Sequence, residues 1–151
     1  MDKGFTLIEL IVVIAIIAIL SGMILFSVSM YINKGKDSNV SGNLAVLIVP
    51  GETYYNSNGA SGYSGFCSST VIINAISQMP GNTFACPSGN SAPNPNAAGL
   101  CCYVKNTNDA WVAYAKEFVN SSNIFCVDSR GVGEDTPSSN IDTIVNNFQC
   151  P

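Results

Sequence analysis

The sequence predicts an α+β protein in which one long N-terminal α-helix packs on a small antiparallel β-sheet head with disulfide-tied loops. Three observations support this class. Residues 1–32 are almost entirely apolar, whereas the remainder is rich in Ser, Asn and Gly. Three strand-like runs lie in the second half of the chain, and all six cysteines follow the apolar segment. The length of 151 residues suits about one domain.

The apolar segment over residues 5–26 is long enough to cross a membrane. As a helix it spans roughly 33 Å, slightly more than the hydrocarbon core of a bilayer. Lys3 before it places the rest of the chain outside under the positive-inside tendency. The competing interpretation is a cleaved secretory signal peptide, which the weakly basic start and the absence of an Ala-x-Ala site disfavour.

Glu9 is a charged residue inside this otherwise apolar segment. It is the only charged residue between Lys3 and Lys34. A carboxylate inside a membrane costs several kcal/mol unless a cation pairs with it, so such residues are usually functional. The simpler alternative is a residue at the start of a helix that favours the positive end of the helix dipole.

The helix is expected to continue as an amphipathic half over residues 27–55. Apolar residues recur near the helical period, at Ile32, Val40, Leu44, Leu47 and Ile48. Pro50-Gly51 predicts a kink or an end near Val49, with a further turn through Tyr54-Tyr55 left open.

The head is expected to occupy residues 56–151. Loop composition covers residues 56–65 and 89–99, and a short helix is predicted over 68–79, with Val71, Ile72, Ala75 and Ile76 on one face. Strands are predicted over 100–105, 110–118 and 124–128, with turns at 106–109 and 120–123. The tail from residue 129 is expected to be loop, with one or two helical turns around Ile141, Ile144, Val145 and Phe148.

The cysteines predict disulfides formed in an oxidising compartment. They are even in number, and none forms a Cys-x-x-Cys pair; the candidates are Cys67, Cys86, Cys101, Cys102, Cys126 and Cys150. The adjacent Cys101 and Cys102 are expected to bond two different partners, and Cys126 is the suggested partner of Cys150. Buried free thiols and a metal site are the alternatives.

No catalytic, metal or cofactor site is predicted. The chain has no histidine, which removes the usual zinc patterns and most nucleophile–base pairs. A Ca²⁺ site among Asp128, Glu134, Asp135 and Asp142 is a minor alternative to a solvated loop, since their spacing matches no EF-hand. A net charge of −4 argues against direct nucleic-acid binding by the bulk of the protein.

The run Gly4-Phe5-Thr6-Leu7-Ile8-Glu9-Leu10, followed by an apolar stretch, resembles the class III signal of type IV prepilins. The same signal occurs in the pseudopilins of type II secretion and competence systems. The resemblance is strongest over residues 1–30. It implies that residues 1–4 are a leader, that prepilin peptidase cuts between Gly4 and Phe5, and that Phe5 is then N-methylated. Glu9 would pair with the amine of Phe5 in a neighbouring subunit.

The resemblance also implies what such a protein does. It would be a non-enzymatic structural subunit of a type IV pilus-like filament, a helical homopolymer used in adhesion, motility or DNA uptake. It would reside in the cytoplasmic membrane as a prepilin and reach the cell surface through an ATPase-driven assembly platform. The alternatives are a pseudopilin or minor pilin within the family, and, from another class, a single-span membrane-anchored binding protein that never polymerises.

Overall fold

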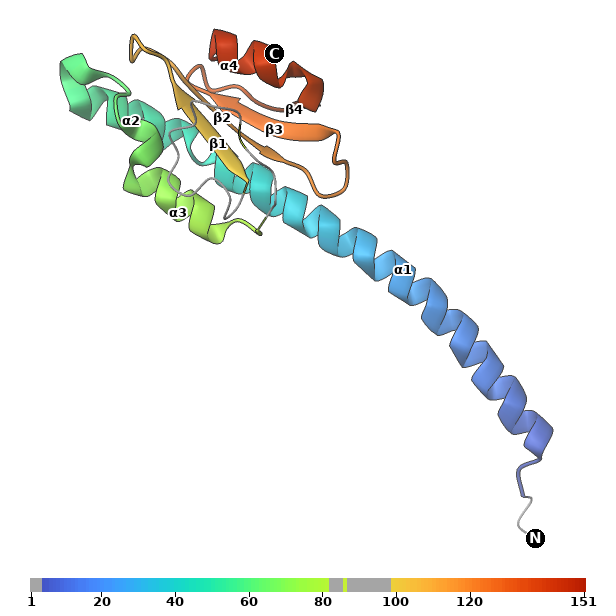
Figure 1. Ribbon diagram of the computed structural model, residues 1–151. Coiled ribbons are helices and arrows are strands. Elements are labelled where there is room, and N and C mark those ends of the chain that lie inside the picture. Colours follow the sequence, from blue (N-terminus) through green and yellow to red (C-terminus); the bar gives the residue numbers. More distant parts are fainter. Residues whose placement is uncertain (1–3, 82–85, 87–98) are drawn as a thin grey trace.

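The computed structural model describes residues 4–81, 86 and 99–151 of the chain. A long helix projects from a small head built around one sheet (Figure 1). The helices are α1 (Leu7–Ala45), α2 (Ile48–Asn58), α3 (Thr70–Gln78) and α4 (Ile141–Asn147), with short 3-10 turns at Gly59–Ser61, Phe66–Ser68 and Ser138–Asn140. The strands are β1 (Leu100–Val104), β2 (Trp111–Lys116), β3 (Asn123–Asp128) and β4 (Gly133–Pro137). The predicted α+β class is confirmed.

The long helix breaks earlier than its proline suggested. α1 ends at Ala45, and α2 resumes at Ile48 and runs on to Asn58. Pro50 has no N–H for the carbonyl of Val46, and its ring collides with that carbonyl, so the regular helix fails four residues upstream. A tighter bond from Leu47 N to Leu44 O, at 2.9 Å, closes the interrupted turn. The kink predicted near Val49 therefore falls slightly upstream, between Ala45 and Ile48, and the further turn through Tyr54-Tyr55 is present in α2.

The sheet is an antiparallel meander in the order β1-β2-β3-β4. The three predicted strands are present, and β4 is an additional edge strand that pairs Cys126 of β3 with Glu134. The sequence of β4, Gly-Glu-Asp-Thr-Pro, has no apolar alternation, because this strand is largely open to solvent. Its register follows from the short connection to β3, with Val127 opposite Gly133.

Both faces of the central strands are buried. Trp111, Ala113 and Ala115 of β2 face α1 and α3, where Val40, Leu44 and Ile72 complete the core. Val112 and Tyr114 face the other way, toward Ile144 of α4, which lies on the far side of the sheet from α1 (Figure 1). Strands covered on both faces lose their alternation of polar and apolar residues, which explains why the two faces of β2 are so alike in sequence.

Three disulfides tie the loops of the head to the sheet. They join Cys67 to Cys102, Cys86 to Cys101, and Cys126 to Cys150. The prediction that the adjacent cysteines bond different partners is confirmed, because neighbouring strand residues point to opposite faces. The suggested pairing of Cys126 with Cys150 is also confirmed, and it anchors the end of the chain under α4.

The two short predicted helices are present. α3 falls within the predicted range of 68–79 and buries Ile72 and Ala75, and α4 supplies the predicted turns of the tail. Of the predicted loop over 89–99, all but Gly99 lies outside the described residues.

Candidate functional site

The first half of α1 is an apolar helix with no packing partner within the described part of the chain. From Phe5 to Leu25 each described residue is exposed, with Ile11 at 51% and Leu25 at 70% of their full surface. Among the residues of this helix whose burial is described, the first buried one is Val40. The helix is long and apolar enough to cross a membrane, and none of its most apolar stretch is buried (Figure 1). Such a surface requires cover from lipid or from other protein.

Glu9 lies in the first turn of this helix and forms a reciprocal cap with Thr6. The Glu9 backbone N–H donates to Thr6 Oγ1 at 3.3 Å, and the Thr6 backbone N–H donates to Glu9 Oε2 at 2.9 Å. The Thr6 hydroxyl also donates to Oε2, at 2.8 Å. This capping box satisfies two of the N–H groups that a helix start leaves unpaired. The Thr-x-x-Glu spacing is a sequence signal for this cap, and the sequence analysis missed it.

The cap leaves Glu9 available for a second partner. Its three bonds within the first turn involve only Oε2 and the backbone N–H, and the side chain is exposed. Gly4 and Phe5 immediately precede the cap and are exposed as well, with Phe5 at 81%. The predicted cleavage point, the cap and the carboxylate therefore lie within about one helical turn. A single chain does not test the pairing of Glu9 with an amine, which stays a prediction.

The four carboxylates considered for Ca²⁺ do not form a shared site. Among the described residues, no group of three or more Asp, Glu or Cys side chains is placed to hold a metal ion. Asp128 is fully buried and is engaged by Arg130, whose Nε and Nη2 donate to Oδ2 at 2.9 and 2.6 Å.

Asp128 instead holds the end of the chain, a role that the sequence analysis missed. The backbone N–H of Cys150 donates to Asp128 Oδ2 at 2.9 Å, and Arg130 Nη2 donates to the Cys150 carbonyl at 2.7 Å. These contacts lie beside the Cys126–Cys150 disulfide. The C-terminal segment is therefore held both by the disulfide and by hydrogen bonds. The Asp-Ser-Arg sequence alone gives no sign of a partner 22 residues further along the chain.

Comparison with known proteins agrees with the geometry of the N-terminus. Residues 1–25 match the family model described as the prokaryotic N-terminal methylation motif. The chain is also similar to the type IV major alpha-pilin of Moraxella bovis, with 56% identity over 44 residues. That stretch covers 29% of this chain and 28% of the relative. No solved structure matches the chain.

The motif and the fold define the class as a protein with an N-terminal methylation motif on a long exposed helix that carries a small α+β head. The motif and the relative together support membership of the type IV pilin family.

Proposed function

We propose that the chain is a non-enzymatic structural subunit that polymerises through its N-terminal helix into a type IV pilus-like filament on the cell surface. One observation carries the proposal. The methylation motif lies on a helix whose apolar side chains are exposed over residues 5–25. The relative, 56% identical over 44 residues, is named a type IV major pilin.

Two environments in succession would cover that helix. Residues 5–26 first span the cytoplasmic membrane, with residues 1–4 as a leader on the inner side, 27–55 as the amphipathic continuation and 56–151 as the head. In the filament the same apolar surface packs against the helices of neighbouring copies. A contact between two different faces of identical subunits repeats without closing and so generates an open helical fibre.

Glu9 supplies the specificity of this assembly. Prepilin peptidase cuts between Gly4 and Phe5, and the new amine of Phe5 is N-methylated. The amine of one subunit then pairs with Glu9 of its neighbour inside the apolar bundle. A buried carboxylate left without a cation is strongly unfavourable, so only the register that pairs the two groups is stable. An ATPase-driven assembly platform would extract the processed subunits from the membrane.

The test combines electron microscopy with mass spectrometry of the same material. Filaments sheared from cells that express the chain should bind an antibody against its head. The chain recovered from them should lack residues 1–4 and carry one methyl group on the amine of Phe5. A chain found only in membranes, with an intact start, would refute the proposal and favour a single-span anchored protein.

A further inference from the structure

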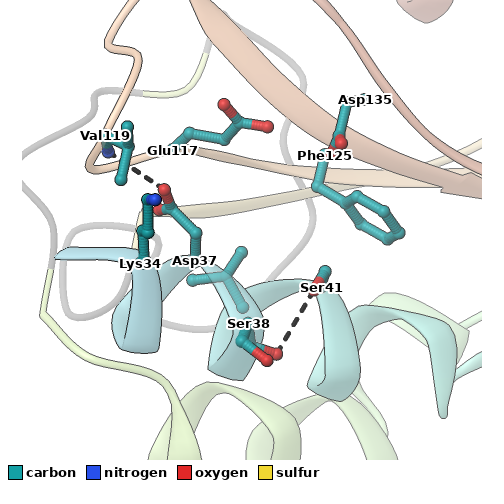
Figure 2. A pocket seen from close by; sticks show the side chains of 9 residues that line it. Lys34, Asp37, Ser38, Ser41, Glu117, Val119, Phe125 and Asp135 are labelled. Carbon is teal, nitrogen blue, oxygen red and sulfur yellow. Dashed lines mark hydrogen bonds between the residues drawn. The ribbon is translucent and has the colours of Figure 1, made fainter. Parts of the chain in front are cut away.

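A cavity of about 340 Å³ lies where α1 joins the sheet (Figure 2). Its charged walls come from three separate parts of the chain, which are α1, the connection from β2 to β3, and the edge strand β4, and Phe125 of β3 adds an apolar wall. The charged residues that line it are Lys34 and Asp37 of α1, Glu117 after β2, and Asp135 of β4. Each of the three structural parts therefore contributes a carboxylate to one opening.

Asp37 attaches α1 to the β2–β3 connection. Its Oδ1 accepts the backbone N–H of Phe118 at 2.6 Å, and its Oδ2 accepts that of Val119 at 3.0 Å. Lys36 adds a contact over the Phe118 ring, with Nζ 4.9 Å from the ring centre. Residues in contact here are 81 and 82 positions apart in the chain. We call this attachment the Asp37 latch.

The Asp37 latch lies at the point where the helix leaves the head. Val40 is fully packed one turn further along, whereas the described part of α1 before Asn33 is exposed. The direction in which the free helix projects is therefore set by the first contacts it makes with the head, and the latch provides the polar ones. Loss of the two bonds would leave Val40 and Leu44 in place and free only the turns before them.

Glu117 and Asp135 lie beside the latch on the same face of the sheet. Glu117 is half-buried. Burial, a hydrogen bond with Asp135 and the charges of Asp135 and Asp37 raise its pKa to about 7. Lys34 is the cation that lines the same cavity. Lys116 and Glu134 neighbour these carboxylates in sequence, and strand alternation directs them to the other face.

We propose that this junction is a proton-operated hinge, in which a proton shared by Glu117 and Asp135 holds the β2–β3 connection against Asp37. Two carboxyl groups form a hydrogen bond only while one of them is protonated. When the proton leaves, three negative charges face one cavity, and Lys34 is the cation among the described residues that line it. The connection then relieves the repulsion by moving away from α1, which breaks both bonds of the Asp37 latch.

The direction of the pH response follows from the sign of the shift. The pKa of Glu117 in the folded chain lies above its ordinary value, so the folded state holds this proton more tightly than the unfolded state. Its contribution to holding the junction is complete below its ordinary pKa of 4.5, declines above that value and is lost as the pH rises through about 7. The free helix is thus fixed to the head in mild acid and swivels in mild alkali. This hinge is independent of the proposed polymerisation.

Amide hydrogen exchange at Phe118 and Val119 tests the hinge directly. The full chain in detergent micelles is measured at pH 6 and pH 8, with each rate corrected for the intrinsic pH dependence of exchange. Protection of these two amides should fall about tenfold, as the protonated fraction of an acid with a pKa of about 7 does over that interval.

Two variants separate the hinge from a general loosening. Glu117→Gln stays neutral and still donates to Asp135, so its protection should be equal at both pH values. Asp142→Asn, which removes an exposed carboxylate in α4, should behave like the unaltered chain. The proposal is overturned if protection in the unaltered chain is the same at pH 6 and pH 8, or if Glu117→Gln loses as much protection as the unaltered chain.

Discussion

Gly51 tests the packing of α2 on the head directly, because alanine at this position overpacks the core, whereas alanine at Gly42 of α1 does not. Gly51 is buried in α2 against the indole of Trp111. A Cβ at this position would lie 3.0 Å from both Cζ2 and Nε1 of that ring. Trp111 is fully buried and packs on Phe66, with ring centres 4.8 Å apart, so the indole has little room to move.

Gly42 is the matched control in α1. A Cβ there would meet no atom within 4 Å, and the residue is exposed. Replacing a helix-interior glycine by alanine stabilises a helix by about 1 kcal/mol. Gly42→Ala should therefore raise the free energy of unfolding by about that amount. Gly51→Ala gains the same term but overpacks the core, which costs about 1–3 kcal/mol, so it should fall below Gly42→Ala by that difference.

Urea unfolding of the full chain in micelles, with the disulfides intact, measures this difference. Trp111 is the single tryptophan and lies in the core, so its fluorescence reports the unfolding of the head. The midpoint should be higher for Gly42→Ala than for the unaltered chain, and the midpoint for Gly51→Ala should lie below that for Gly42→Ala, with an unchanged denaturant slope. Equal stabilisation by both substitutions would refute the close contact between α2 and the indole.

Three further changes probe the cap and the C-terminal anchor. Thr6→Ala removes the side chain of the helix cap and should cost about 1 kcal/mol, seen as faster amide exchange in the first turn, while Thr6→Ser retains protection. Asp128→Asn removes the charge of a buried carboxylate that accepts bonds from Arg130 and from the Cys150 amide, and should lower the free energy of unfolding by about 1.5–3 kcal/mol in urea titrations; a loss below 1 kcal/mol would contradict the anchor. Replacing Cys126 and Cys150 by serine opens a loop of 24 residues and should cost about 3.5 kcal/mol in the same titrations.

The sequence contained the signals for most of the local structure. Apolar periodicity identified the helices, and β-branched and aromatic runs identified three strands. β4 could not be found in this way, because an edge strand that faces solvent needs no apolar residues and forms through its pairing with β3. The helix break was misplaced because the effect of Pro50 falls on the carbonyl four residues before it.

Contacts between distant parts of the chain had no local signal. Asp37 accepts hydrogen bonds from the backbone N–H groups of Phe118 and Val119. Almost every residue has such a group, so the sequence does not indicate which one an aspartate will bind. The hydrogen-bonding role of Asp128 and two of the three disulfide pairings likewise required the fold. In contrast, the Gly4-Phe5 and Glu9 motif is local, and residues 1–25 match the prokaryotic N-terminal methylation motif.

Glu9→Gln tests most directly whether the pair between Glu9 and the amine of Phe5 directs assembly. Glutamine at this position still forms a capping box with Thr6 but carries no charge to pair with an amine. Cells that express this variant should accumulate processed subunit, without residues 1–4, in the membrane and should show no sheared filaments by electron microscopy. Thr6→Ala, which weakens the cap and leaves the charge, should still give filaments. Filaments of Glu9→Gln at the yield of the unaltered chain would contradict the claim that the Glu9–amine pair directs assembly.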